Sequence, residues 1–112
     1  MTLILAYKSR GITREITILD AAGATITPGA NDVIKAIVLR LGETPKLTVT
    51  SAAPTSNGSS FTKGATCTLR LDNADLSTID PGTYTLEIQL VDHADAQEPK
   101  VVQRQVFVLE NS

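Results

Sequence analysis

The chain has 112 residues, of which 42% are hydrophobic and 4% aromatic, and its formal charge is −2 at neutral pH. This length suits a single domain over residues 1–112, whose core must be built from Leu, Ile, Val and Ala. The slightly acidic balance and scattered basic residues disfavour nucleic-acid binding, which needs a basic stripe. No stretch approaches the roughly 18 apolar residues of a membrane span, so no membrane partner is expected.

The N-terminal segment Met1–Tyr7 is apolar, but it carries neither a basic leader nor a cleavage site. We therefore expect a first strand over Leu3–Lys8 and not a signal peptide. The single cysteine cannot form an internal disulfide, which is compatible with synthesis in a reducing cytoplasm.

The first half of the chain continues with apolar segments separated by turn signals, which is typical of strands. A tight turn is expected at Asp20–Gly23, because Asp can bond the following backbone and Gly accepts a positive φ. Asp32–Leu41 is the most apolar segment and predicts a central strand. The extended segments expected here are Ile12–Leu19 (with Ile12, Arg14, Ile16 and Ile18 on one side), Ala24–Thr27, Asp32–Leu41 and Lys46–Thr50.

The middle of the chain predicts a long loop over Ser51–Gly64, because Ala, Ser, Thr, Asn and Gly dominate it. Phe61 is the exception, and we expect its ring to pin the loop to the body. A strand over Ala65–Leu71 follows, with Cys67, Leu69 and Leu71 facing together. Asp72–Ser77 predicts one helical turn, with Asn73 or Asp75 as its N-cap.

The clearest pattern is the strict alternation over Thr83–Val91, which is typical of a strand with one core face and one wet face. Tyr84, Leu86, Ile88 and Leu90 share the predicted core face, and Thr83, Thr85, Glu87 and Gln89 share the other. A polar loop is expected over Asp92–Pro99, and a last strand over Val101–Leu109 closes the domain.

These seven or eight short strands, without a long helix, predict an all-β sandwich or a small barrel. Tyr84 follows Asp80-Pro81-Gly82-Thr83 at the start of a strand. In immunoglobulin-like sandwiches a tyrosine near such a corner bonds a backbone carbonyl a few residues upstream, and we expect the same structural role for Tyr84.

Three polar clusters contain residue types that occur in metal or acid–base sites. His93 lies between Asp92 and Asp95, but a transition-metal site usually needs several His or Cys ligands. Two oxygen-rich sets lack the central Gly and terminal Glu of a calcium loop, so turns and capping explain them better. These sets are Asp92, Asp95 and Glu98, and Asp72, Asn73 and Asp75.

The remaining reactive or modifiable residues also have structural explanations. Cys67 alternates with leucines, so a buried and inert thiol is expected. Asn57-Gly58-Ser59 matches a glycosylation sequon, but without a secretory signal it is better interpreted as a turn. No nucleophile motif such as Gly-x-Ser-x-Gly occurs. The sequence therefore predicts no catalytic residue, no cofactor and no metal site.

The order of these segments resembles a family. A strand ending at Leu71 leads through Asp72–Leu76 to Asp80-Pro81-Gly82-Thr83-Tyr84 and the alternating strand to Val91, with Asp92 after it. Earlier, Ile16–Asp20 leads into an Ala/Gly turn, then Ile26-Thr27 and the Val33–Leu41 strand. Over Ile12–Leu109 this is similar to the immunoglobulin-like β-sandwich domains of tailed-phage virion proteins, such as the N-terminal domain of baseplate upper proteins.

The resemblance implies a non-enzymatic structural protein of the virion, synthesised in the cytoplasm of a bacterial host. Baseplate proteins of this kind continue into further domains, whereas this sequence ends at Ser112. We therefore expect a small accessory subunit of tail, baseplate or neck. Its partners would be other virion proteins and further copies of itself, as a homo-oligomer or repeated subunit. Contacts would use the sheet edges, the Met1–Tyr7 segment and the Ser51–Gly64 loop.

Three alternatives remain open. A head decoration (cement) protein on the capsid belongs to the same class. A carbohydrate or cell-surface binding module needs exposed aromatic side chains, and the chain has only Tyr7, Phe61, Tyr84 and Phe107. A small hydrolase has no supporting motif.

Overall fold

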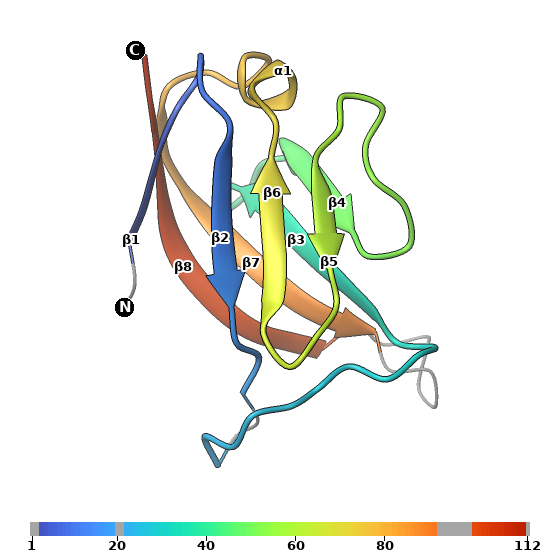
Figure 1. Ribbon diagram of the computed structural model, residues 1–112. Coiled ribbons are helices and arrows are strands. Elements are labelled where there is room, and N and C mark those ends of the chain that lie inside the picture. The colour runs from blue at the N-terminus through green and yellow to red at the C-terminus, as the bar shows by residue number, and fades with distance from the viewer. Residues whose placement is uncertain (1–2, 20–21, 92–99, 112) are drawn as a thin grey trace.

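The computed structural model describes residues 3–19, 22–91 and 100–111. These residues form two β-sheets that pack face to face, with one helical turn at an end of the sandwich (Figure 1). The elements are β1 (Leu3–Tyr7), β2 (Ile12–Ile16), β3 (Val33–Leu39), β4 (Leu47–Thr50), β5 (Ser60–Thr62), β6 (Cys67–Leu71), α1 (Asn73–Leu76), β7 (Gly82–Val91) and β8 (Lys100–Glu110).

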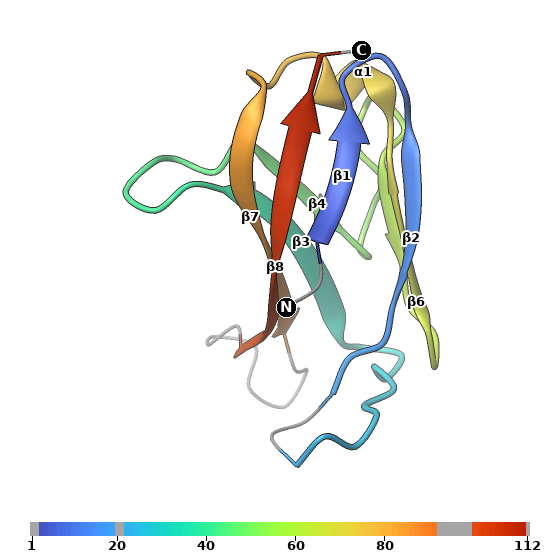
Figure 2. The ribbon, with the colours of Figure 1, turned by 90° about the vertical axis from the view of Figure 1, so that its left-hand side faces the viewer.

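The topology is that of an immunoglobulin-like sandwich. One sheet has the order β1-β8-β7-β3-β4 and the other the order β2-β6-β5. Antiparallel pairing joins the neighbours, except that β1 runs parallel to β8. The β2-β6-β5 sheet corresponds to strands B, E and D of an immunoglobulin domain, and β3, β7 and β8 correspond to C, F and G. The predicted fold class is thereby confirmed, and Figure 2 shows the two layers from the side of β1 and β8.

The core lies between the sheets and is built from alternate residues of the strands. The predicted inward faces of β6 and β7 are confirmed, since every residue placed on them is buried. Phe107 of β8 is fully buried among these aliphatic side chains and, with Phe61 and Tyr84, supplies the aromatic part of the core. The buried residues of β3, β6 and β7 are Ile34, Ala36, Val38, Cys67, Leu69, Leu71, Tyr84, Leu86, Ile88 and Leu90.

The tyrosine corner is also confirmed. The Tyr84 hydroxyl donates a hydrogen bond of 2.6 Å to the backbone carbonyl of Asp80, four residues upstream. The ring is 3% exposed and belongs to the core. Tyr84 therefore fixes the chain at the point where it enters β7.

The expected strand over Ile12–Leu19 was too long. β2 ends at Ile16, because its partner β6 begins at the opposite residue, Cys67, and the ladder between the two strands stops there. Ile18 is nevertheless buried. The short extended piece at residues 24–27 makes a single bridge, between Leu19 and Thr25. Of the turn expected before it, residues 20–21 lie outside the described residues.

Two further expectations are wrong. The segment Ser51–Gly64 is not a loop throughout, because β5 lies inside it and pairs with β6. Phe61 is the buried residue of β5, which agrees with the expectation that its ring pins this segment to the body of the domain. The N-cap of α1 is Asp72, whose carboxylate accepts from the Ala74 backbone N–H at 2.9 Å. The cap thus lies one residue before the first position expected.

Candidate interaction surfaces

Only one of the polar clusters considered as metal sites lies within the described residues. His93, Asp92, Asp95 and Glu98 lie outside the described residues. Across residues 3–19, 22–91 and 100–111, no three His, Cys, Asp or Glu side chains come together so as to hold a metal ion. Of the second acidic set, Asp72 caps α1 and also pairs with Arg70 at 3.5 Å.

Asp75 is turned into the protein. Its carboxylate is 7% exposed and accepts from the Thr55 hydroxyl at 2.6 Å, the Asn57 amide at 2.9 Å and the Ser59 hydroxyl at 2.5 Å. Burial is the largest single influence on the pKa of Asp75 and would raise it, but the three hydrogen bonds together outweigh burial and lower that pKa. Asp75 is thus a buried anion that holds a loop.

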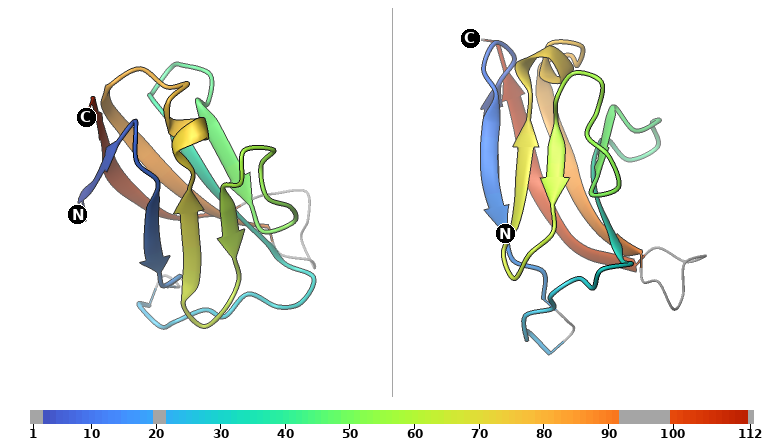
Figure 3. Two further views of the ribbon diagram at one scale, coloured as in Figure 1. Left: turned by 45° about the horizontal axis from the view of Figure 1, so that its top comes forward. Right: turned by 45° about the vertical axis from the view of Figure 1, so that its right-hand side comes forward.

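Ser59 completes this attachment. Its hydroxyl is fully buried, donates to Asp75 and accepts from the Asp72 backbone N–H at 2.8 Å. A turn between Thr55 and Gly58 is closed by a backbone hydrogen bond of 3.0 Å. The loop before β5 therefore rises beside α1 and is fastened to its first turn (Figure 3). The interpretation of Asn57-Gly58-Ser59 as a turn is confirmed, and the Asn57 amide serves the fold.

Cys67 is the first residue of β6 and is fully buried. Its sulfur lies 3.6 Å from the Gly64 carbonyl oxygen. The predicted buried thiol is confirmed, and the fold leaves it inaccessible to large reagents.

One side of the sandwich presents two open sheet edges. In the described residues β1 pairs with β8 alone, and β2 pairs with β6 alone. Ile4 and Ala6 of β1 are buried, whereas Leu3 and Leu5 on its outer face are 59% and 38% exposed. The first strand therefore offers both unpaired backbone groups and apolar side chains to the outside.

A groove of about 410 Å³ lies between these two edges. Its walls come from the start of β1, from β2 and from the middle of β8, and the Gln103 amide donates across it to the Thr17 carbonyl. The lining residues are Leu3, Ile4, Arg14, Glu15, Ile16, Thr17, Gln103 and Gln105.

The hairpin between β3 and β4 projects from the body of the domain (Figure 2). Leu41 at its tip is 99% exposed. The sequence placed Leu41 in the central strand, which is wrong, because β3 ends at Leu39. The sequence signal that marks a turn at this point is the neighbouring Gly42. Its φ of +81° is a backbone conformation that few other residues adopt.

A second hollow, of about 370 Å³, lies where β4 ends and β5 begins. Ala53 and Pro54 supply exposed apolar surface, and Phe61 closes the floor towards the core. The lining residues are Thr50, Ser51, Ala53, Pro54, Ser60, Phe61, Thr62 and Lys63.

Within the described residues, the longest helix is the single turn α1, and no helix has the length and apolarity of a membrane span. Comparison of the chain with protein-family models and with curated proteins gives no match.

Proposed function

We propose that this chain is a non-enzymatic structural subunit of a tailed-phage virion, used in repeated copies as an accessory component of the tail, baseplate or neck. Its partners would be other virion proteins and further copies of the chain. The virion setting follows from the resemblance of the sequence to phage β-sandwich domains, and the single observation that carries the assembly role is the open β1 edge, which presents backbone hydrogen-bonding groups together with the exposed Leu3 and Leu5. A free edge of this kind is a template for a strand of another chain.

The neighbouring strand extends this apolar surface. Leu3 is the register partner of Val106 and Leu5 of Val108, and both valines are half-buried. Exposed apolar side chains that gather on one face mark interaction surfaces more often than isolated ones do. A partner that adds a strand to β1 would cover the leucines at the same time.

The chemistry of the buried polar residues also favours a structural role. Among the described residues the buried carboxylate is that of Asp75, and the hydrogen bonds that it accepts hold a loop in place. The glycan-binding alternative is weakened because Phe61, Tyr84 and Phe107 are all buried, which leaves Tyr7 as the accessible aromatic side chain. Sugar-binding faces stack their ligands on exposed rings, and one half-buried tyrosine makes a poor platform.

Cryo-electron microscopy of purified particles of the encoding phage, with mass spectrometry of the same preparation, tests the proposal. We expect regular copies of a domain of this size on the tail, neck or baseplate. Copies on the capsid shell would favour the decoration role instead. Particles that lack the protein would overturn the virion proposal.

A further inference from the structure

Asn57-Gly58 is the most reactive asparagine sequence of the chain. An asparagine amide is open to attack by the backbone nitrogen of the residue that follows it, and glycine, which has no Cβ, leaves that nitrogen most accessible. Asn57 is also exposed in the structure. The other asparagines of the chain precede bulkier residues, in Asn31-Asp32, Asn73-Ala74 and Asn111-Ser112.

The structure engages both reacting groups in hydrogen bonds. The Asn57 amide donates to Asp75 Oδ1 at 2.9 Å, and the Gly58 backbone N–H donates to the Thr55 carbonyl at 3.0 Å. The Gly58 carbonyl in turn accepts from the Arg70 guanidinium at 3.0 Å. Attack by Gly58 needs the Asn57 side chain to fold back over its own backbone, so these bonds must open first. We call this set of hydrogen bonds the Asn57 latch.

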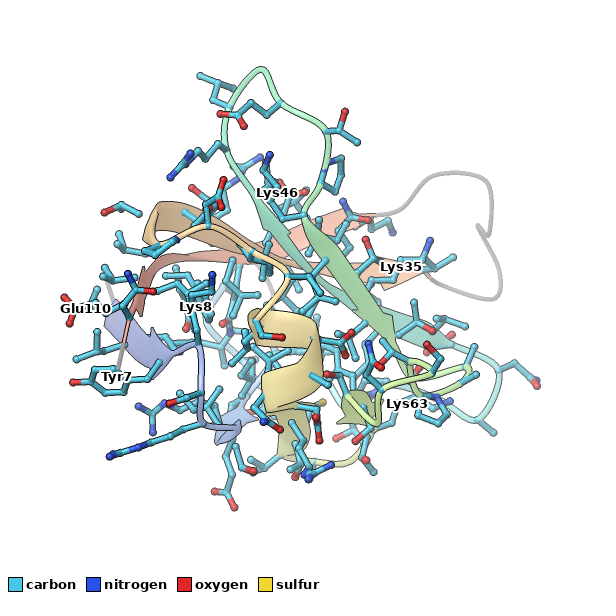
Figure 4. All side chains as sticks on the ribbon, turned by 90° about the horizontal axis from the view of Figure 1, so that it is seen from above. Tyr7, Lys8, Lys35, Lys46, Lys63 and Glu110 are labelled. Atoms are coloured by element: carbon cyan, nitrogen blue, oxygen red, sulfur yellow. The ribbon has the colours of Figure 1, made fainter. Side chains whose placement is uncertain are left out.

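The latch lies at an accessible end of the sandwich. Figure 4 shows the domain from this end, with α1 towards the viewer and the loop before β5 beside it, on the side of Lys63. Ser56 and Asn57 are exposed, whereas the neighbouring Ser59 is buried. Water therefore reaches Asn57 in the folded domain, and a local opening of the loop is enough to free its side chain.

We propose that Asn57 is a site of spontaneous deamidation, held back by its attachment to Asp75. When the loop opens, the Gly58 nitrogen forms a bond to the side-chain carbon of Asn57, the bond between that carbon and the amide nitrogen breaks, and ammonia departs with the Gly58 proton. The resulting succinimide ring takes up one water molecule at either carbonyl and opens to aspartate or isoaspartate. Water is the one co-reactant, and the inference stands apart from the proposed virion function.

The product does not fit the latch. The Asn57 amide donates to Asp75, whereas a carboxylate at position 57 can only accept, so two negative groups would face each other where a donor and an acceptor are now 2.9 Å apart. Isoaspartate also adds a methylene to the main chain and disturbs the turn. Deamidation therefore releases the loop from α1 irreversibly, and the fraction of chains with a released loop rises with the age of the protein.

Ageing of the purified chain in mildly alkaline buffer tests the proposal. Peptide mapping by mass spectrometry measures the one-dalton mass gain at each asparagine. In the wild type we expect Asn57 to deamidate faster than Asn31 and Asn73, which are exposed as well. Asp75→Ala should accelerate the reaction at Asn57 about tenfold, because loss of a hydrogen bond to a charged acceptor favours the opened loop by about that factor. The rates at Asn31 and Asn73 should not change.

Two control variants separate local opening from a general loss of stability. Ile16→Ala removes a buried side chain opposite Cys67 at the start of β6, whereas α1 follows the end of that strand. It should destabilise the fold as Asp75→Ala does but leave the rate at Asn57 unchanged. Asn57→Gln keeps the amide on a longer side chain that cyclises slowly, so no mass gain is expected at position 57.

A product mimic tests the release of the loop without ageing. In Asn57→Asp the backbone amide of Ser59, which donates to the Thr55 hydroxyl at 3.0 Å, should exchange hydrogen faster than in the wild type or in Asn57→Gln. Unchanged exchange would contradict the release. An intact Asn57 in aged wild-type and Asp75→Ala chains would overturn the site, and equal acceleration by Ile16→Ala would overturn the role of the latch.

Failure of this inference is distinct from failure of the proposed function. Particles that carry the chain in regular copies, with Asn57 intact after ageing, would leave the virion function and remove the deamidation site. Deamidation at Asn57 in the purified chain, together with particles that lack the chain, would keep the site and remove the virion function.

Discussion

The guanidinium of Arg40 stacks on the ring of Tyr84, with 4.3 Å between the guanidinium carbon and the ring centroid. Its Nε also donates to the Thr83 carbonyl at 3.3 Å. Because the Tyr84 hydroxyl is bonded to Asp80, this one ring connects the base of the β3–β4 hairpin with the turn that enters β7. Hairpin and corner should therefore respond together to changes at Tyr84.

Replacing Tyr84 by Phe keeps the ring and removes the hydrogen bond to Asp80. We expect the free energy of unfolding to fall by about 1 kcal/mol, because the carbonyl at this exposed turn can be solvated in the variant. Urea unfolding measures the change. Tyr7→Phe is the matched control and should leave the midpoint unchanged; an unchanged midpoint for Tyr84→Phe as well would contradict the role of the corner bond.

Gly82 is the second residue that shapes the turn into β7, beside Tyr84. Its φ is +153°, and a Cβ at this position would collide with the Arg40 guanidinium. Gly82→Ala should therefore destabilise the fold by about 1–2 kcal/mol, through backbone strain and displacement of Arg40 from the ring.

A double-mutant cycle separates the two contributions of Gly82. In an Arg40→Ala background only the backbone strain should remain, so Gly82→Ala should cost less there than in the wild type. Equal costs in the two backgrounds would show that the guanidinium yields without loss.

Asp75 fastens the loop before β5 to α1. Asp75→Ala removes the acceptor of three hydrogen bonds and leaves the buried Ser59 hydroxyl without its acceptor, so we expect a loss of about 2–3 kcal/mol in unfolding free energy. Hydrogen exchange of the Ser59 and Asp72 amides should accelerate with it. Asp80→Asn, at an exposed side chain, is the control. Wild-type stability in the Asp75→Ala variant would contradict the anchoring role.

Because the pKa of Asp75 is lowered in the folded state, we expect the stability of the fold to decrease in acid. Because the carboxylate is favoured in the folded state, its contribution to stability is complete above the usual value of 3.8 and is lost as the pH falls through the folded-state pKa. Thermal unfolding between neutral pH and pH 2–3 should show this acid-side loss. The Asp75→Asn variant should be less stable at neutral pH and should approach the wild type in acid; a constant difference across the range would contradict the linkage.

The β1 edge gives the fifth prediction. Deletion of residues 1–7 removes an edge strand, so the remaining sandwich should keep its far-ultraviolet circular dichroism at reduced stability, because Ile4 and Ala6 no longer cover the core. If β1 pairs or exchanges between subunits, the deletion also shifts the assembly to monomer. Retention of the oligomer by the folded deletion variant would refute an assembly role for this strand.

The sequence predicted the fold well where an alternating segment also has a pairing partner along its whole length, whereas β2 is shorter than its alternation. The core faces of β6 and β7 and the Tyr84 corner bond follow from period-two patterns and one turn motif. β5 could not be found in the same way, because it has three residues and one buried side chain, Phe61. Its strand character comes from its neighbour β6, which offers a free edge to a segment that is polar by composition.

The interaction surfaces were less predictable for a different reason. Whether Leu41 is in a strand or at a hairpin tip depends on where pairing between β3 and β4 stops, and pairing is a tertiary property. Likewise, Asp75 could be recognised as a capping or turn residue, but its burial depends on hydroxyl groups 16 to 20 positions earlier in the chain. A local sequence pattern does not predict contacts between residues so far apart in the chain.

The parallel pairing of β1 with β8 has a consequence for how the chain folds during synthesis. The register joins Leu3 to Val106, so β1 is synthesised long before its partner β8 and stays unpaired until β8 follows. Closing so long a loop is slow, since folding rates fall as contacting residues lie further apart in sequence. For that interval the nascent chain carries an unpaired apolar strand, and chains growing side by side on one messenger RNA have time to meet through it.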